Sequence, residues 1–349
     1  MNSLNNTVKI KELKYIGEKD WDNFVKSFSQ RTFFHSWAWL EFLRINFRFK
    51  PLHLGIFSNN KTVGVFPAIE CQKGPLKIIA SPLSGTHTSY MGPLVSSILL
   101  RETIEAFFYF LKERHYDYVE IAFPYHLERN IFTQSDFHIQ DKQTYIVKLE
   151  NDSDKMWEKL HSNCRNMIRK AQKSGIEIVE ANQREEIVEF YKMLKEISNR
   201  RKGIPMKSLS FYYNLWDCFR KNGQLKLLFA KYKDKLVAGA IFPHDDEGVF
   251  CFSVGGYKEY LKYAPNNLIQ WQIIKWASKN KLKYYNMYGG VGSGGIGRFK
   301  ESFGPEIITY TQAWKSITLR AKFGRLAYVK IYKLNQKMRY YFDRYKFLK

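Results

Sequence analysis

Hydrophobic and polar positions change period repeatedly along the chain, which predicts strands and helices in alternation. Two segments, 51–69 and 224–243, each place two apolar runs on either side of a short polar turn, so each predicts a β-hairpin. Their second strands carry similar sequences, VGVFP at 63–67 and AGAIFP at 238–243. The two hairpins lie about 175 residues apart, which favours an internal duplication of one α/β unit.

Three segments show helical spacing of apolar residues: 31–45, 151–175 and 264–280. In the second, Asp152 or Ser153 can cap the start and Gly175 can end the helix. Its predicted buried face consists of Met156, Leu160, Cys164, Met167 and Ala171. Another face carries a row of cationic positions without compensating acids, which is typical either of a solvated face or of an anion-binding surface. This row consists of His161, Arg165, Arg169 and Lys173.

Further elements follow in the second half of the chain. The residues 248–256 and 283–290 predict strands, and the second of these leads into a glycine-rich segment. Residues 316–349 contain ten Lys or Arg and one acid. Apolar residues recur there at spacings of three and four, which predicts a long amphipathic helix. They are Ile331, Leu334, Met338, Tyr341 and Tyr345.

The composition is that of a soluble globular chain with room for two domains: 349 residues, 45% hydrophobic and 26% charged. The apolar runs fall short of the ~18 residues that cross a bilayer, and the first residues do not resemble a signal peptide. The four cysteines are far apart, which indicates reduced thiols in the cytoplasm. We therefore expect a cytoplasmic protein.

The formal net charge is +23, and aromatic residues make up 17% of the chain. A charge of this size attracts polyanions such as nucleic acid, anionic lipid or phosphorylated substrates. A Lys-rich, AT-biased genome would produce the same excess, and both interpretations stay open.

Common catalytic motifs are absent from the sequence. The pattern Gly290-x-Gly292-x-x-Gly295 matches a dinucleotide fingerprint, but it lies close to the end of the chain, outside a first βα unit, so we reject it. The eight His residues lack metal-binding spacing, and a GxSxG nucleophile elbow is missing. The acidic run at 244–248 is interpreted as a hairpin tip. We expect neither a metal nor a protein nucleophile.

Five segments in order carry a family resemblance. They are RNMIRKAQKSGIEI at 165–178, NRRKGIP at 199–205 with FYYNLW at 211–216, LLFAKYKDKLVAGAI at 227–241, YAPNNLIQWQIIKWA at 263–277 and YGGVGSGGIGRFKESFGPE at 288–306. Together they resemble the Fem-like peptidoglycan-bridge aminoacyltransferases and their relatives with a BioF2-like acetyltransferase domain, within the GNAT superfamily. The resemblance covers residues from about 30 to about 315.

The resemblance implies an α/β fold with mixed sheets, built of two tandem GNAT-type units. We expect a first unit at 1–150, a second unit at 151–315 that carries most of the site, and a basic aromatic helix at 316–349 that packs back on the first unit. Members of the family move an aminoacyl group from charged tRNA, or an acyl group from a thioester such as acyl-CoA, to an amine of a cell-envelope precursor.

The resemblance also implies roles for individual residues. Lys300 assists acyl transfer with Phe299 beside it, and Lys207 binds the phosphates of the acceptor. The remaining candidates for substrate binding are Arg200, Arg201, Arg165, Arg169, Trp39 and Tyr90.

The sequence departs from the tRNA-dependent members at two places. Leu43 and Arg44 stand where those enzymes usually have a Lys, and Tyr90-Met91-Gly92-Pro93 stands in place of their Arg-Gly-Pro. The usual GNAT loop for coenzyme A is also missing. The acceptor and the acyl donor are therefore both open.

We expect an N-acyltransferase without a bound cofactor, whose co-substrate is aminoacyl-tRNA or acyl-CoA. Its expected partners are a phosphorylated or lipid-linked envelope precursor, tRNA and an anionic membrane surface, with neither DNA nor metal. The expected location is the cytoplasm, including the inner face of the membrane. The alternative is a non-catalytic RNA-binding or membrane-surface protein.

Overall fold

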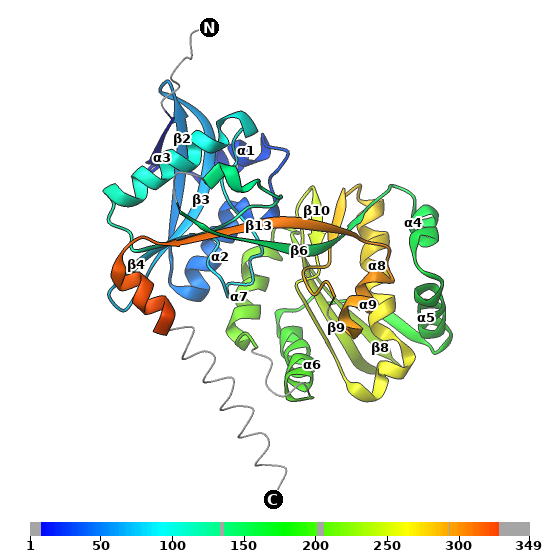
Figure 1. Ribbon diagram of the computed structural model, residues 1–349. Helices are drawn as coiled ribbons and strands as arrows, with labels where there is room; N and C mark the ends of the chain where they lie inside the picture. The colour runs from blue at the N-terminus through cyan, green and yellow to red at the C-terminus, as the bar shows by residue number, and fades with distance from the viewer. Residues whose placement is uncertain (1–7, 133–135, 201–205, 293, 328–349) are drawn as a thin grey trace, which may run out of the picture. The chain divides into compact units, whose positions relative to one another are not determined.

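A computed structural model describes residues 8–132, 136–200, 206–292 and 294–327. The chain divides into one unit formed by 1–141 and 311–349 and a second unit formed by 142–310. Two strands, β6 (His138–Lys148) and β13 (Glu306–Ser316), carry the chain from one unit into the other (Figure 1). The α/β fold with mixed sheets in two units, predicted above, is confirmed.

Both units repeat one order of elements, β-α-α-β-β-β-α-β, when the two short strands at 248–250 and 253–256 are counted as one, in agreement with the predicted duplication. In the first unit the elements are β1 (Val8–Glu12), α1 (Glu18–Lys26), α2 (Trp37–Phe47), β2 (Lys50–Ser58), β3 (Lys61–Lys73), β4 (Leu76–Ser81), α3 (Leu100–Glu113) and β5 (Tyr118–Ala122). In the second unit, α4 (Ser153–Lys159) and α5 (Ser162–Lys173) precede β7 (Ile176–Glu180), α6 (Ile187–Arg200), α7 (Leu209–Phe219), β8 (Leu225–Tyr232), β9 (Lys235–Pro243), β10 (Gly248–Phe250), β11 (Ser253–Gly256), α8 (Pro265–Lys279), β12 (Tyr284–Asn286) and α9 (Gly295–Glu301).

The sheet of the first unit is covered by helices on both faces. Strands β1 to β4 pair antiparallel in sequence order, β4 pairs parallel with β5, and residues 312–316 of β13 pair with β5. The β2–β3 turn is the predicted one, and Asn59 and Asn60 both take the positive φ that such a tight turn needs. One face packs on α3, and His53 on the other face stacks 4.1 Å from Trp37 of α2.

The second unit has the same layering. Its sheet has the order β11-β9-β8-β7, and the β8–β9 hairpin is the second predicted one. Helices α5 and α8 pack on one face of this sheet, and α6 packs on the other. On that second face a Cβ on Gly239 would lie 2.8 Å from the ring of Phe229, and a Cβ on Gly255 would lie 2.8 Å from Met193 of α6. The glycines therefore allow α6 to approach the sheet closely.

The strand predicted at 248–256 changes partners halfway along. Its first part, β10, pairs parallel with β12, whereas its second part, β11, pairs antiparallel with β9. The change falls at Cys251, whose N–H donates to the carbonyl of Asn286 (2.8 Å), and Phe252, whose N–H donates to the carbonyl of Ile241 (3.0 Å). In the first unit, by contrast, Ile79 of β4 pairs with both of its neighbours. The sheet is continuous there and divided in the second unit.

Two predicted helices differ in their limits. The helix predicted at 31–45 begins only at Trp37, because the Ser36 side chain caps it by accepting from the N–H of Trp39. The helix predicted at 151–175 is two helices, since Leu160 takes an extended backbone (ψ 139°) between α4 and α5. Asp152 caps the first of them as expected, and in α5 Ile168 is buried rather than the predicted Met167.

A helix also begins after β13, at residue 319, and is described to residue 327. The predicted apolar positions from 331 to 345 lie outside the described residues. Of the helices that the structure describes, none has the length and apolar character needed to cross a membrane.

Candidate active site

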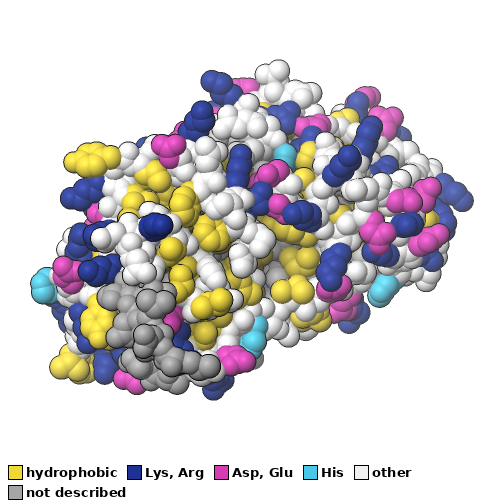
Figure 2. Space-filling view, turned by 90° about the horizontal axis from the view of Figure 1, so that it is seen from above, with side chains coloured by type: hydrophobic (Ala, Val, Ile, Leu, Met, Phe, Trp, Pro, Cys, Tyr) yellow, Lys and Arg dark blue, Asp and Glu magenta, His cyan; other side chains and the backbone are white. Residues whose placement is uncertain are grey.

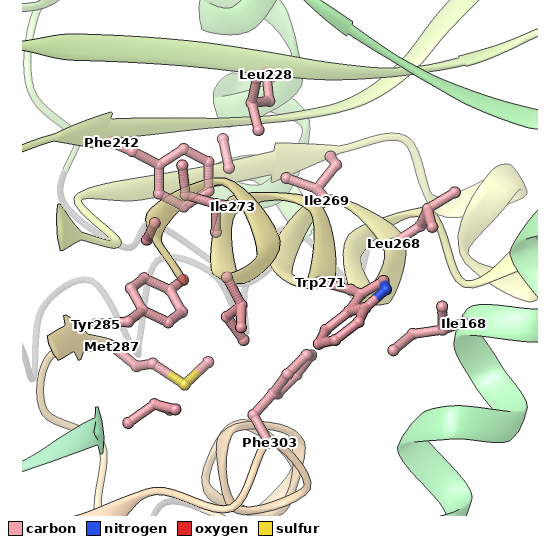
Figure 3. Close-up of a cluster of buried hydrophobic side chains, with 14 of the residues drawn as sticks. Ile168, Leu228, Phe242, Leu268, Ile269, Trp271, Ile273, Tyr285, Met287 and Phe303 are labelled. Carbon is pink, nitrogen blue, oxygen red and sulfur yellow. The ribbon is translucent and has the colours of Figure 1, made fainter. Parts of the chain in front are cut away.

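The best candidate site lies in the second unit, where β12 ends and the chain enters the glycine-rich segment. Helix α9 follows this segment and carries Phe299 and Lys300. Phe299 is half-buried, lies 5.3 Å from the ring of Phe303 and packs against the core of the unit. Figure 3 shows this core, in which Phe303 points toward Trp271 of α8. Because one side of α9 is anchored in the core, Lys300 is held at a defined place.

The Lys300 ammonium group is bound by backbone carbonyls. Its Nζ donates to the carbonyls of Met287 (2.5 Å) and Gly289 (2.6 Å), and the carbonyl of Tyr288 is more distant at 3.4 Å. Burial lowers the pKa of Lys300, and the nearby Cys251 acts in the opposite direction. Carbonyl oxygens favour the charged form. The result is a cation fixed in position at the end of β12.

The turn that supplies these carbonyls is itself fixed. Tyr288 takes a positive φ of 60°. In this conformation the carbonyl groups of Met287, Tyr288 and Gly289 all face the Lys300 ammonium. The Asn286 side-chain oxygen accepts from the N–H of Tyr288 (2.8 Å) and from the Thr144 hydroxyl of β6 (2.9 Å). Asn286 is fully buried. The geometry around Lys300 therefore depends on residues distant in sequence.

A row of aromatic rings leads from Lys300 to Lys207. The ring of Tyr288 lies 6.1 Å from Phe252, which stacks at 6.0 Å on Phe211 of α7. Lys207, in the loop before α7, lies over Phe211 at 5.5 Å. We call Phe211, Phe252 and Tyr288 the aromatic row. Burial lowers the pKa of Lys207. Phe252 of this row is also one of the two residues at which the 248–256 strand changes partners. Lys300, Lys207 and the division of the sheet therefore lie in one region of the second unit.

Polar groups lie in the core beneath this region. The Tyr285 hydroxyl donates to the side-chain oxygen of Gln270 on α8, and the Gln270 amide nitrogen lies 3.6 Å from the Cys251 sulfur. Burial raises the pKa of the Cys251 thiol and of the Tyr285 hydroxyl. Both groups are therefore neutral at physiological pH, and the thiol is not activated as a nucleophile.

A further pair of residues fixes the glycine-rich segment. The hydroxyl of Tyr145, a fully buried residue of β6, donates to the Glu301 carboxylate at 2.6 Å, and this hydrogen bond raises the pKa of Tyr145. The Gly292 N–H points to the same hydroxyl. A Cβ on Gly297 would lie 3.5 Å from it, so the segment packs closely on Tyr145. Neither Tyr145 nor Glu301 is predicted as a site residue from the sequence, where the position of Glu301 next to Lys300 is the one signal for this pair.

The cationic candidates of α5 have local partners. Arg165 donates through Nη1 to the carbonyls of Glu158 (3.1 Å) and Leu160, so it holds the break between α4 and α5. Arg169 lies 5.3 Å over the ring of Trp157. These contacts link Arg165 and Arg169 to the region of α4 and not to Lys300. A role for either arginine in substrate binding stays a prediction.

The other candidates are placed as follows. Arg200 ends α6, while Arg201 lies outside the described residues. Trp39 and Tyr90 belong to the first unit and are buried, and the Trp39 indole donates to the Thr88 hydroxyl at 3.1 Å. Any contribution from Trp39 to binding would therefore act through the loop that contains Thr88.

The basic excess does not form a single patch on the face seen in Figure 2. Lys and Arg side chains are spread over that face, with Asp and Glu among them. The acidic run at 244–248 is a turn, as expected, since the Asp245 carboxylate accepts from the N–H groups of Glu247 (2.9 Å) and Gly248 (2.8 Å). Across the described ranges, three or more metal-ligating side chains do not gather at any point.

Comparison with known proteins gives a consistent result. Residues 158–301 match the family model of the acetyltransferase (GNAT) domain. A lipid II:glycine glycyltransferase of Staphylococcus epidermidis is 26% identical over 104 residues, or 30% of this chain and 24% of that protein. The corresponding enzyme of Staphylococcus haemolyticus is 26% identical over 100 residues, or 29% of this chain and 23% of that protein. The chain thus spans about a quarter of the length of these curated relatives.

Solved structures match over most of the chain. FemX superposes with a TM-score of 0.70 at 14% identity, covering 87% of this chain and 96% of that one. L-PGS from Bacillus licheniformis superposes with a TM-score of 0.54 at 12% identity, covering 88% of this chain and 94% of that one. At such identities the likeness concerns the fold.

Proposed function

We propose that this chain, whose residues 158–301 match the acetyltransferase (GNAT) domain, is a Fem-like N-acyltransferase that modifies an amine of a cell-envelope precursor. The observation that carries the proposal is the Lys300 ammonium, held by two short carbonyl contacts where the sheet of the second unit is divided. The match to the GNAT domain ends at residue 301 and includes Lys300.

The proposed reaction needs a fixed cation. The acceptor amine attacks the carbonyl carbon of an ester or thioester, and a negative charge develops on the carbonyl oxygen as the C–N bond forms. Two N–H donors of Lys300 are engaged by Met287 and Gly289, whereas the contact with the Tyr288 carbonyl is long. We propose that the third N–H exchanges this long contact with Tyr288 for one with the developing oxyanion, a stabilisation of about 3–4 kcal/mol.

The remaining steps balance without a protein nucleophile. The tetrahedral intermediate collapses, the C–O or C–S bond to the donor breaks, and the proton lost by the attacking amine passes to the leaving alcohol or thiol through water or substrate groups. The Cys251 thiol, whose pKa is raised by desolvation, stays neutral and takes no part.

We further propose that Lys207 and the aromatic row bind the acceptor. A cation with apolar and aromatic surface beside it suits a molecule that combines a phosphate with a less polar part. Lipid II, named in the curated relatives, has this character, and a phosphorylated or lipid-linked envelope precursor is the substrate class we favour.

The donor is proposed to be aminoacyl-tRNA or acyl-CoA, and one assay separates them. With charged tRNA as donor, transfer by the purified protein should stop after RNase treatment and fall steeply with salt, because phosphate contacts release counterions. With acyl-CoA as donor, transfer should survive RNase and require the added thioester. Either result identifies the donor class.

The proposed function is tested by mass spectrometry of envelope precursors from cells with and without the protein. We expect a precursor whose mass is higher by one acyl or aminoacyl group only in cells that have it. Complementation with Lys300→Met should not restore this species, whereas Arg298→Met, an exposed residue of the same helix, should restore it. Identical precursor masses in both strains would reject the proposal.

A further inference from the structure

The helix that begins at residue 319 is attached to the first unit by its polar side chains. The carboxylate of Asp117, which is fully buried, accepts from Arg320 (2.5 and 2.9 Å) and from the Thr318 hydroxyl (2.7 Å). Arg325 lies 4.6 Å over the ring of Trp314 and donates to the Tyr118 hydroxyl at 2.5 Å. The face of the helix that contacts the unit is therefore formed largely by arginines.

The large apolar side chains of this helix point away from the unit. Leu319 is 70% exposed, Phe323 is 69% exposed and Leu326 is 60% exposed. Their spacing of four and three residues places them on one side of the helix, and we call them the outer apolar stripe. Ala321, by contrast, is buried. Three large apolar side chains with most of their surface in water on one short helix face indicate an interaction surface.

The charge around the stripe limits what can cover it. Arg320 and Lys322 are exposed cations on the same helix, and residues 316–349 contain ten Lys or Arg with one acid. A second copy of this chain, with its formal charge of +23, would be repelled by this segment. A helix with Leu and Phe on one side and Lys and Arg at its flanks is instead typical of segments that lie at an anionic membrane interface.

We propose that the outer apolar stripe docks on a bilayer that contains anionic phospholipid. Leu319, Phe323 and Leu326 would enter the boundary between headgroups and acyl chains, and Lys322 would meet phosphate groups. Arg320 and Arg325 keep the helix attached to the first unit, so docking brings the folded protein to the membrane. This proposal does not depend on the proposed acyltransferase reaction.

The test uses the full chain and vesicle flotation. We expect the protein to float with vesicles of phosphatidylcholine mixed with phosphatidylglycerol, and to float much less with phosphatidylcholine alone. Leu319→Ser, Phe323→Ser and Leu326→Ser combined should weaken the binding by about tenfold or more, because the apolar area that leaves water is lost. Lys322→Gln alone should weaken it by roughly fivefold at low salt.

The matched control replaces two other exposed apolar residues of the first unit, Ile98→Ser with Tyr109→Ser. It should bind as the unchanged protein does, and both multiple variants should keep its melting temperature, since the replaced side chains lie in water. If the unchanged protein does not float with anionic vesicles, or if the stripe variant floats equally well, the proposal is wrong. A stripe variant that loses only self-association in sedimentation would assign the surface to a second copy and also overturn it.

Discussion

Replacing Lys300 with Met tests whether this lysine acts in the reaction or only supports the fold. Methionine has a similar length and no charge, so it fills the same space without donating to the carbonyls of Met287 and Gly289. Leaving these acceptors without a charged donor should cost roughly 2–3 kcal/mol of stability. For a unit of this size that corresponds to a fall in Tm of about 5–10 °C.

The expected loss of activity is larger than this loss of stability can explain. Removing one donor to a developing oxyanion lowers kcat by about 100-fold to 1,000-fold while KM changes little, because the contact is made mainly in the transition state. The assay is steady-state kinetics on the purified variant at a temperature where circular dichroism finds it fully folded. Under these conditions a structural role alone predicts nearly normal turnover.

Two controls sharpen this prediction. Arg298→Met removes a cation from the exposed side of the same helix and should leave both kcat and Tm unchanged. As the pH rises, the kcat of the unchanged protein should decline with an apparent pKa below the value of about 10.4 that an ordinary lysine has. The reason is that burial lowers the pKa of Lys300, which therefore loses its proton earlier. A Lys300→Met protein that is folded and retains full kcat would refute the reasoning.

The other predictions concern stability. His35, His53 and His244 are buried and have pKa values of about 4, lowered by desolvation, so the unfolded chain takes up protons first as the pH falls below 6.5. The free energy of unfolding should therefore decrease between pH 6.5 and pH 4, by about 2 kcal/mol per histidine at pH 5. Urea unfolding at pH 7 and at pH 5 measures this difference, and equal midpoints at the two pH values would contradict it. Tyr145→Phe should cost roughly 1.5–3 kcal/mol and expose the glycine-rich segment to proteases, because Glu301 loses its donor. Tyr109→Phe, at an exposed position, is its control, and equal cleavage rates for the two variants would argue against a role for Tyr145 in fixing that segment.

The sequence determined the features that depend on neighbouring residues. Both hairpins occur where the polar turns predict them, since Asn59, Asn60 and Lys233 take the positive φ of a tight turn. Helix α8 lies within one residue of its predicted limits at each end, and the apolar positions Leu268, Trp271, Ile274 and Ala277 are buried. Period, turn residues and caps are local properties, so they can be read before the chain folds.

The resemblance predicted the GNAT domain that residues 158–301 match and pointed to Lys300 as a candidate, but it could not describe what surrounds this lysine. The carbonyls that hold its ammonium come from the turn after β12, and that turn is fixed by Thr144 of β6 through Asn286. The Thr144–Asn286 and Tyr145–Glu301 hydrogen bonds join segments more than a hundred residues apart. Hydropathy patterns along the sequence do not predict such long-range hydrogen bonds.

Only the tertiary structure decided where regular elements are interrupted. The residues 248–256 alternate like one strand, yet two different neighbours compete for them and the strand divides at Cys251 and Phe252. The helix predicted across 151–175 breaks at Leu160, where Arg165 binds the freed carbonyl. In both places the local pattern permits a regular element, and the hydrogen bonds and burial available from distant segments outweigh it. The candidate site lies at the first of these interruptions, where the carbonyl groups that follow β12 bind the Lys300 ammonium.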